Sequence, residues 1–159
     1  MTMRPAPAIL AALVAVTAAA SPSTGEDAAP MSSSQKQPFQ AYADMKTFME
    51  HVLTPAAKII WSVNAVVIDQ QGEHDLSPKT EADWEQIVSG AATLAEATNA
   101  LMIPQRARDP QWAFYVQKLA EAANKAYLAA EARDLKTIAE VSDRLDGICA
   151  ACHRHYGLE

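Results

Sequence analysis

The sequence predicts an all-α fold, an antiparallel four-helix bundle, and three observations lead to this prediction. Apolar residues recur at helical spacing in four stretches separated by polar loops. Alanine is abundant, whereas only 5 of 159 residues are glycine and 6% are aromatic, a composition that favours helix over sheet. No stretch shows the alternation of a half-buried strand. Four amphipathic helices joined by three connections are expected to pack around one core.

The first predicted helix runs from about Gln40 to about Asp69, and residues 70–75 are expected to form a loop. Pro55 lies inside this helix, where a proline removes a backbone donor and clashes with the preceding turn. We therefore expect a kink between Val52 and Thr54, with Thr54 capping a restarted helix.

The other three helices have recognisable ends. Thr80 and Asp83 form a capping-box pattern at the start of the second helix, and Pro104 ends it. The third begins at Asp109-Pro110, a cap followed by a first-turn proline. The fourth runs from about Leu135 to Tyr156. The folded domain is thus expected to cover residues 39–159.

Residues 1–20 have the pattern of a signal peptide. Arg4 is their only charged residue, and a short apolar run ends in Ala18-Ala19-Ala20, a typical cleavage site. The run is too short and too rich in alanine to be a strong membrane span, so we expect no stable membrane insertion after cleavage. An uncleaved anchor is the alternative. Residues 21–38, rich in Ser, Pro and Gln, are expected to be a disordered linker.

The formal net charge of −6 disfavours binding to nucleic acid or to an anionic membrane surface. It is compatible with a cationic protein partner. From the signal-peptide pattern we expect secretion across a bacterial-type inner membrane into the periplasm.

The chain's only two cysteines lie in the stretch Cys149-Ala150-Ala151-Cys152-His153. Cys-x-x-Cys-His is the attachment signature of a c-type haem. On a helix, Cys149 and His153 are four residues apart and share a face with Cys152, so all three side chains point at one object. Val141 and Leu145 extend this face and are expected to form an apolar floor for the porphyrin. We expect one covalent haem c; a non-haem helical module with a disulfide or a bound metal is the alternative.

With this motif inside the last dozen residues of a four-helix chain, the sequence resembles the class II cytochromes c, meaning cytochrome c′ and its low-spin relatives. The resemblance covers about Phe39 to Tyr156, and Tyr156 follows the histidine by three residues, as is usual in the family. It implies that Cys149 and Cys152 hold the porphyrin and that His153 is the proximal iron ligand. The sequence carries no acid–base set of its own, so we do not expect an enzyme.

The distal side of the iron decides between two functions. Lys46-Thr47-Phe48-Met49 matches the family's first-helix motif and puts Met49 at the distal position, with Met45 one turn earlier as its competitor. A methionine ligand implies a one-electron carrier that works with redox protein partners. A vacant site implies a five-coordinate protein that binds NO or CO. Relatives often form homodimers through their first two helices.

Several further residues are expected to serve packing or solvation. His51, His74 and His155 are predicted to lie on the surface. The tryptophans Trp61, Trp84 and Trp112 are expected to pack between helices. Because a glycine within a helix costs about 1 kcal/mol relative to alanine, Gly147 is expected to allow close packing.

Overall fold

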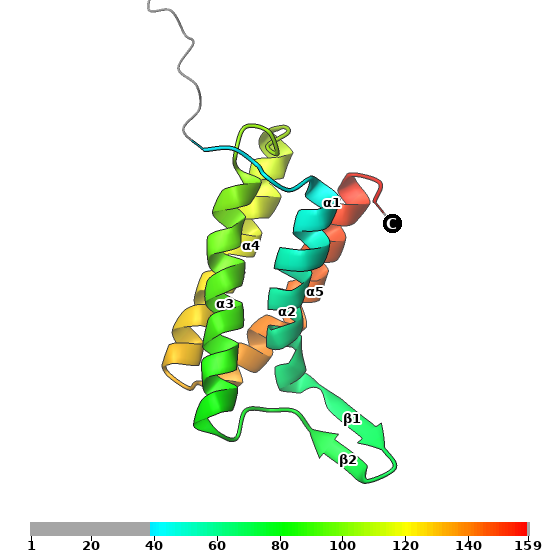
Figure 1. Ribbon diagram of the computed structural model, residues 1–159, viewed down its shortest axis with the longest axis vertical. Helices are drawn as coiled ribbons and strands as arrows, with labels where there is room; N and C mark the ends of the chain where they lie inside the picture. Colours follow the sequence, from blue (N-terminus) through cyan, green and yellow to red (C-terminus); the bar gives the residue numbers. More distant parts are fainter. Residues whose placement is uncertain (1–38, 159) are drawn as a thin grey trace, which may run out of the picture. The chain divides into compact units, whose positions relative to one another are not determined.

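Helices make up most of the part of the chain that the computed structural model describes, residues 39–158 (Figure 1). The predicted signal peptide and linker lie outside these residues. In chain order the elements are α1 (Met45–Phe48), the π-helical turn η1 (Met49–Leu53), α2 (Thr54–Trp61), the 3-10 turn η2 (Ser62–Asn64), β1 (Val66–Asp69), β2 (Gly72–Asp75), α3 (Glu81–Leu101), α4 (Pro110–Glu131) and α5 (Leu135–His155). The helical prediction is confirmed, but a small sheet is present as well.

The first helical segment changes its winding where the proline was expected to disturb it. The turn Met49–Leu53 is π-helical and ends just before Pro55, and the Thr54 N–H donates to the Met49 carbonyl, five residues back. A residue without an N–H leaves the preceding turn free to widen in this way. The predicted cap at Thr54 is wrong, because the backbone stays helical through Leu53 and Thr54 and no side chain caps α2.

The three long helices begin where the sequence predicts. Thr80 and Asp83 form both hydrogen bonds of the capping box at the start of α3. The Asp109 side chain accepts from the Trp112 N–H at 2.8 Å and caps α4. Asp134 caps α5 in the same way. None of the helices in the described part has the length and apolar character needed to cross a bilayer.

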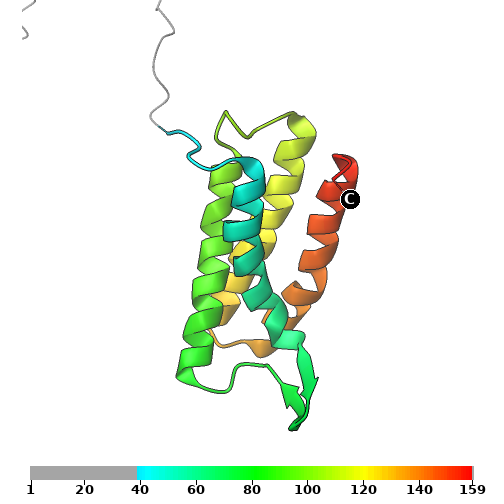
Figure 2. The same ribbon diagram turned by 45° about the vertical axis from the view of Figure 1, so that its right-hand side comes forward.

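The long helices pack in sequence order around a shared core. Helix α3 contacts α2 and α4, and α5 contacts α4 and α2; Figures 1 and 2 show them side by side. The largest side chains with almost no exposure are Ile60, Leu94, Ile138 and Leu145. The α2–α3 contact is tight at Gly90, where an added Cβ would lie 2.8 Å from the Ile59 Cβ. The packing role expected for Gly147 is wrong, since an added Cβ would meet nothing within 4 Å there.

A β-hairpin replaces the predicted end of the first helix and the loop after it. The helical segment ends at Asn64, and β1 pairs antiparallel with β2, with Val66 opposite Asp75 and Asp69 opposite Gly72. Consecutive β-branched residues favour strand, and a short apolar run does not reveal its period in the sequence. Every residue of the hairpin is exposed, and it lies at the end of the helices opposite the C-terminus (Figure 1).

Candidate haem site

The motif Cys149–His153 faces a cavity between the helices. The side chains of Cys149, Cys152 and His153 line it from α5, and Met49 lines it from η1. The cavity is open to solvent on one side, and it holds about 740 Å³ of unfilled space when that open mouth is counted. The rest of its wall is largely apolar and includes Leu53, Ala57, Leu94, Leu101, Leu119 and Ile148.

Helix α5 aims the motif into this cavity because its preceding turns are fixed in the core. Val141 and Leu145 are buried, 3% and 0% exposed, and they anchor the helix face that carries Cys149. They do not line the cavity, so the floor predicted from them is wrong. Ile148 and side chains from the other helices form that surface instead. The reason is that this helix face, from Val141 to His153, is more than three turns long and passes from the core to the cavity along its length.

Both thiols are free in the structure and have the electrostatics of unreactive cysteines. Burial, with a smaller contribution from the negative charge of Asp146, raises the pKa of Cys149 to about 11. Burial also raises the pKa of Cys152. Redox-active Cys-x-x-Cys pairs depend on a lowered thiol pKa, which this site does not provide. Within residues 39–158, no group of three or more His, Cys, Asp or Glu side chains is arranged to hold a metal ion.

The structure separates the two candidate methionines. Met49 shares the cavity with the motif, whereas Met45, one turn earlier, lines a different cleft together with Ala41, Asp44 and Arg106. Met49 also opens the π-helical turn. Such turns often occur at functional sites, because one wider turn redirects the side chains on it.

Two of the three tryptophans line the cavity. The indole N–H of Trp112 donates to the Leu101 carbonyl at 2.9 Å. The Nε1 of Trp61 is buried and has no hydrogen-bond partner among the described residues. Buried donors are normally paired, and a bound group with an acceptor would supply the partner that this atom lacks. A thiol pair, an imidazole, a thioether and an apolar wall fit a porphyrin with iron at its centre. Trp84 does not line this cavity.

A polar contact fixes the C-terminal end of α5 beside the motif. The Tyr156 hydroxyl donates to Asp109 Oδ1 at 2.8 Å, and the Tyr156 ring meets that of Trp112 edge-on, with centroids 5.5 Å apart. The hydrogen bonds from Trp112 and Tyr156 lower the pKa of Asp109. Burial and the Asp109 carboxylate raise the pKa of Tyr156 to about 12. The guanidinium of Arg108 covers the Tyr156 ring at 4.9 Å. The sequence indicated only the helix cap at Asp109.

Arg106 is a second residue whose position the sequence did not reveal. It lies in the loop between α3 and α4, yet it is only 7% exposed. Its Nη1 donates to the Ala100 carbonyl at 3.1 Å and its Nη2 to the Ala43 carbonyl at 3.0 Å. The guanidinium also lies 4.1 Å from the centre of the Phe48 ring. It thereby ties the chain before α1 to the end of α3, and no local pattern predicts such a long-range contact.

The three remaining histidines lie outside the cavity, as predicted. His51 and His155 are exposed on the helical segments, and His74 is exposed in β2. His74 Nε2 lies 3.1 Å from Asp69 Oδ1 across the hairpin. The His155 ring packs against Tyr115 and Tyr156, with centroids 5.5 and 4.8 Å away.

Comparison of the chain with protein-family models, with curated proteins and with solved structures finds no match. The resemblance to class II cytochromes c therefore rests on the residues of the chain itself.

Proposed function

We propose that this chain is a periplasmic c-type cytochrome that carries single electrons between redox proteins. The observation that carries this proposal is the cavity shared by Cys149, Cys152 and His153 from one helix and Met49 from another. We also propose that the fold is an antiparallel four-helix bundle. The contacts of α3 with α2 and α4, and of α5 with α4 and α2, support an antiparallel four-helix bundle whose last helix attaches the haem.

Each residue has a defined role in this proposal. Cys149 and Cys152 would hold the cofactor by adding their S–H groups across its two vinyl groups, forming thioethers. His153 would donate an imidazole lone pair to the iron, and Met49 would donate a thioether lone pair. Bound haem would supply a reversible Fe(III)/Fe(II) couple. The apolar wall would limit contact of the bound group with water, and Tyr156 with Asp109 holds the end of the helix that carries His153.

The first test is chemical. The full chain is produced in a host that matures c-type cytochromes, and its intact mass and visible spectrum are recorded. We expect one covalently bound haem, a low-spin spectrum and the weak near-infrared band of methionine bound to ferric iron. Protein recovered folded from that host without covalent haem would overturn the proposal in favour of a non-haem module.

A matched pair of variants tests the distal ligand. Met49→Leu should abolish the near-infrared band and give a high-spin spectrum, because leucine fills similar volume without a donor atom. Met45→Leu, one turn away on a different cleft, should leave the spectrum unchanged. The opposite result would assign the ligand to Met45.

A gas-binding function is the second candidate. Leu53 and Ala57 are apolar side chains in the same cavity wall as Met49, and a neutral diatomic ligand needs no polar partner there. A high-spin spectrum of the unmodified protein, with CO binding to its reduced form, would favour this function over electron transfer.

A further inference from the structure

The hairpin exposes apolar side chains that nothing in the described structure covers. Val66, Val67 and Ile68 are 51%, 43% and 78% exposed, and they follow one another along β1. An isolated two-stranded hairpin is marginally stable in water, and an apolar edge strand is a ready template for a further strand. The hairpin therefore has the composition of an interface rather than of a solvated loop.

The hydrogen-bonding pattern of the hairpin shows which groups are available. The Leu76 N–H donates to the Ala65 carbonyl at 3.0 Å, so this facing pair is a hydrogen-bonded one. Hydrogen-bonded and non-hydrogen-bonded pairs alternate along an antiparallel ladder. With Val66 opposite Asp75 and Ile68 opposite Glu73, the N–H and C=O groups of Val66 and Ile68 point away from β2.

We propose that β1 pairs antiparallel with β1 of a second copy of this chain, about a twofold axis at Val67. This register puts Val66 of each copy opposite Ile68 of the other, and it pairs the outward N–H and C=O groups of both residues. The two hairpins would form one four-stranded sheet. Because both copies use the same surface, the contact closes as a dimer.

The charges of the hairpin select β1 over β2 as the pairing edge. Between two copies of β1, the facing residues near the axis are all apolar. The equivalent pairing of two β2 strands about His74 would put Glu73 of each copy opposite Asp75 of the other. Like charges that face each other across a ladder are destabilising. In the proposed dimer these carboxylates lie on the outer strands and flank a central apolar strip.

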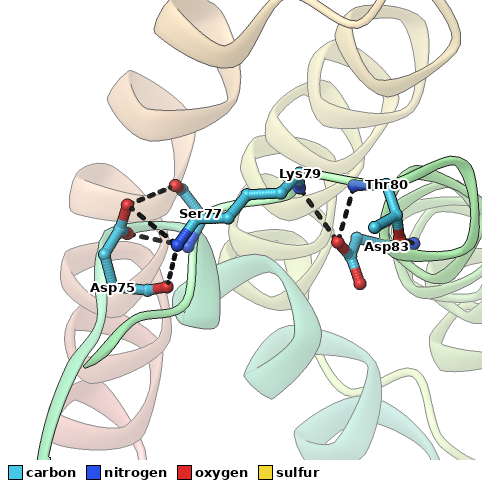
Figure 3. Close-up of polar contacts among 5 residues, drawn as sticks. All are labelled: Asp75, Ser77, Lys79, Thr80 and Asp83. Atoms are coloured by element: carbon cyan, nitrogen blue, oxygen red, sulfur yellow. Dashed lines mark hydrogen bonds and ion pairs between the residues drawn. The ribbon is translucent and has the colours of Figure 1, made fainter.

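A polar network fixes the base of the hairpin relative to α3 (Figure 3). The Asp75 carboxylate accepts from the N–H and hydroxyl of Ser77 at 2.9 and 2.7 Å. Lys79 Nζ donates to the Asp75 carbonyl at 2.9 Å, and the Asp83 carboxylate accepts from the Lys79 and Thr80 N–H groups at 2.9 and 2.8 Å. The hairpin edge is thus presented in a defined orientation, which reduces the entropy cost of pairing.

The size and charge of this contact set its expected strength. Two short strands bury less than the roughly 1,200 Å² of a standard interface, so the dimer should be weak and dependent on concentration. Each copy carries a net charge of −6, so the copies repel each other at low ionic strength. Added salt should therefore strengthen the dimer rather than dissociate it.

Sedimentation equilibrium of the full chain tests the proposal. We expect the average mass to rise from monomer towards dimer with concentration, and to rise further in added NaCl. Ile68→Pro should abolish the dimer, because it removes an N–H that points outward and leaves the ladder to β2 intact. Glu73→Pro is the matched control: it removes the equivalent outward N–H from the opposite edge, and the dimer should persist.

A second variant keeps the test decisive if the prolines disturb the hairpin. Ile68→Lys retains the backbone N–H and places a charge in the apolar strip, one residue from the twofold axis, and it should also leave the protein monomeric. A wild-type protein that stays monomeric at about millimolar concentration in high salt, a range that detects even weak contacts, would overturn the proposal. A dimer that survives both Ile68→Pro and Ile68→Lys would place the contact elsewhere. Neither result depends on the iron ligands, since the mass is measured without reference to the spectrum.

Discussion

Near the chain's C-terminus, apolar side chains surround a cavity between the helices. At the opposite end of the helices, Val66, Val67 and Ile68 lie exposed on a hairpin. Each end leaves polar groups without partners in the described structure. In the cavity the group is the Trp61 indole N–H, and on the hairpin the groups are the outward backbone atoms of β1. The difference indicates two kinds of partner: a largely apolar cavity suits a small cofactor, and an open strand edge suits another strand.

The largest expected effect comes from truncating the same residue type in the two environments. Ile60 is 0% exposed on α2, and Ile60→Ala should lower the free energy of unfolding by about 2–5 kcal/mol. Ile68→Ala, on the hairpin, should change it by less than about 0.5 kcal/mol in dilute protein. Denaturant titration followed by circular dichroism measures both. Equal losses would show that the hairpin is buried in solution.

A smaller effect is expected from replacing two glycines, of which Gly90 is closely packed and Gly147 is not. In Gly90→Ala the new Cβ would lie 2.8 Å from Ile59 Cβ and Cγ2, so we expect a loss of about 1–3 kcal/mol from overpacking. Gly147 has open space around it and lies inside α5, so Gly147→Ala should stabilise by roughly 0.5–1 kcal/mol. Thermal unfolding of the two variants should shift in opposite directions. A loss in Gly147→Ala would mean that bound haem reaches that position.

The stability of the fold at alkaline pH should depend on Tyr156, which lies beside the cavity. The pKa of Tyr156 is raised to about 12, from 10.0. A raised pKa in the folded state means that the contribution of Tyr156 is complete below pH 10 and is lost as the pH rises towards 12. The melting temperature of the wild type should therefore fall more steeply over this range than that of Tyr156→Phe. Tyr42→Phe is the control, since Tyr42 is 91% exposed, and its profile should follow the wild type.

The sequence predicted the features that depend on neighbouring residues and missed those that depend on residues far apart in the chain. The three long helices begin at Thr80, Asp109 and Asp134, where a local side chain satisfies the first backbone donors, and such signals are readable over four residues. That Met49 and Cys149 line one cavity was implied by the family resemblance and not by the helical spacing.

The misses depend on information that is not local. Val66–Ile68 was assigned to a helix because three apolar residues in a row do not define a period, and pairing with β2 decided the outcome. The buried position of Arg106 depends on the Ala43 carbonyl, far away in the chain. Glycines are ambiguous in the same way: Gly90 packs closely and Gly147 does not, although both lie inside helices.

The smallest expected difference between the two ends is in their stability at acid pH. Hydrogen bonds from Trp112 lower the pKa of Asp109 below 3.8, and those from Ser77 do the same for Asp75. Each carboxylate therefore stabilises its own end of the molecule above about pH 3.8, and this contribution is lost as the pH falls through its lowered pKa. Asp109 holds the cavity end and Asp75 the base of the hairpin.

Asp109→Asn should flatten the dependence of the melting temperature on pH below 4, because it removes a carboxylate whose pKa lies below 3.8 in the folded protein. Asp75→Asn should leave that dependence unchanged and should instead speed the hydrogen exchange of the Val67 and His74 amides, which pair across the hairpin. Melting curves and exchange monitored by NMR separate the two results. If Asp75→Asn flattened the melting profile as much as Asp109→Asn does, the hairpin and the helices would unfold as one unit, and the two ends could not be treated as energetically independent.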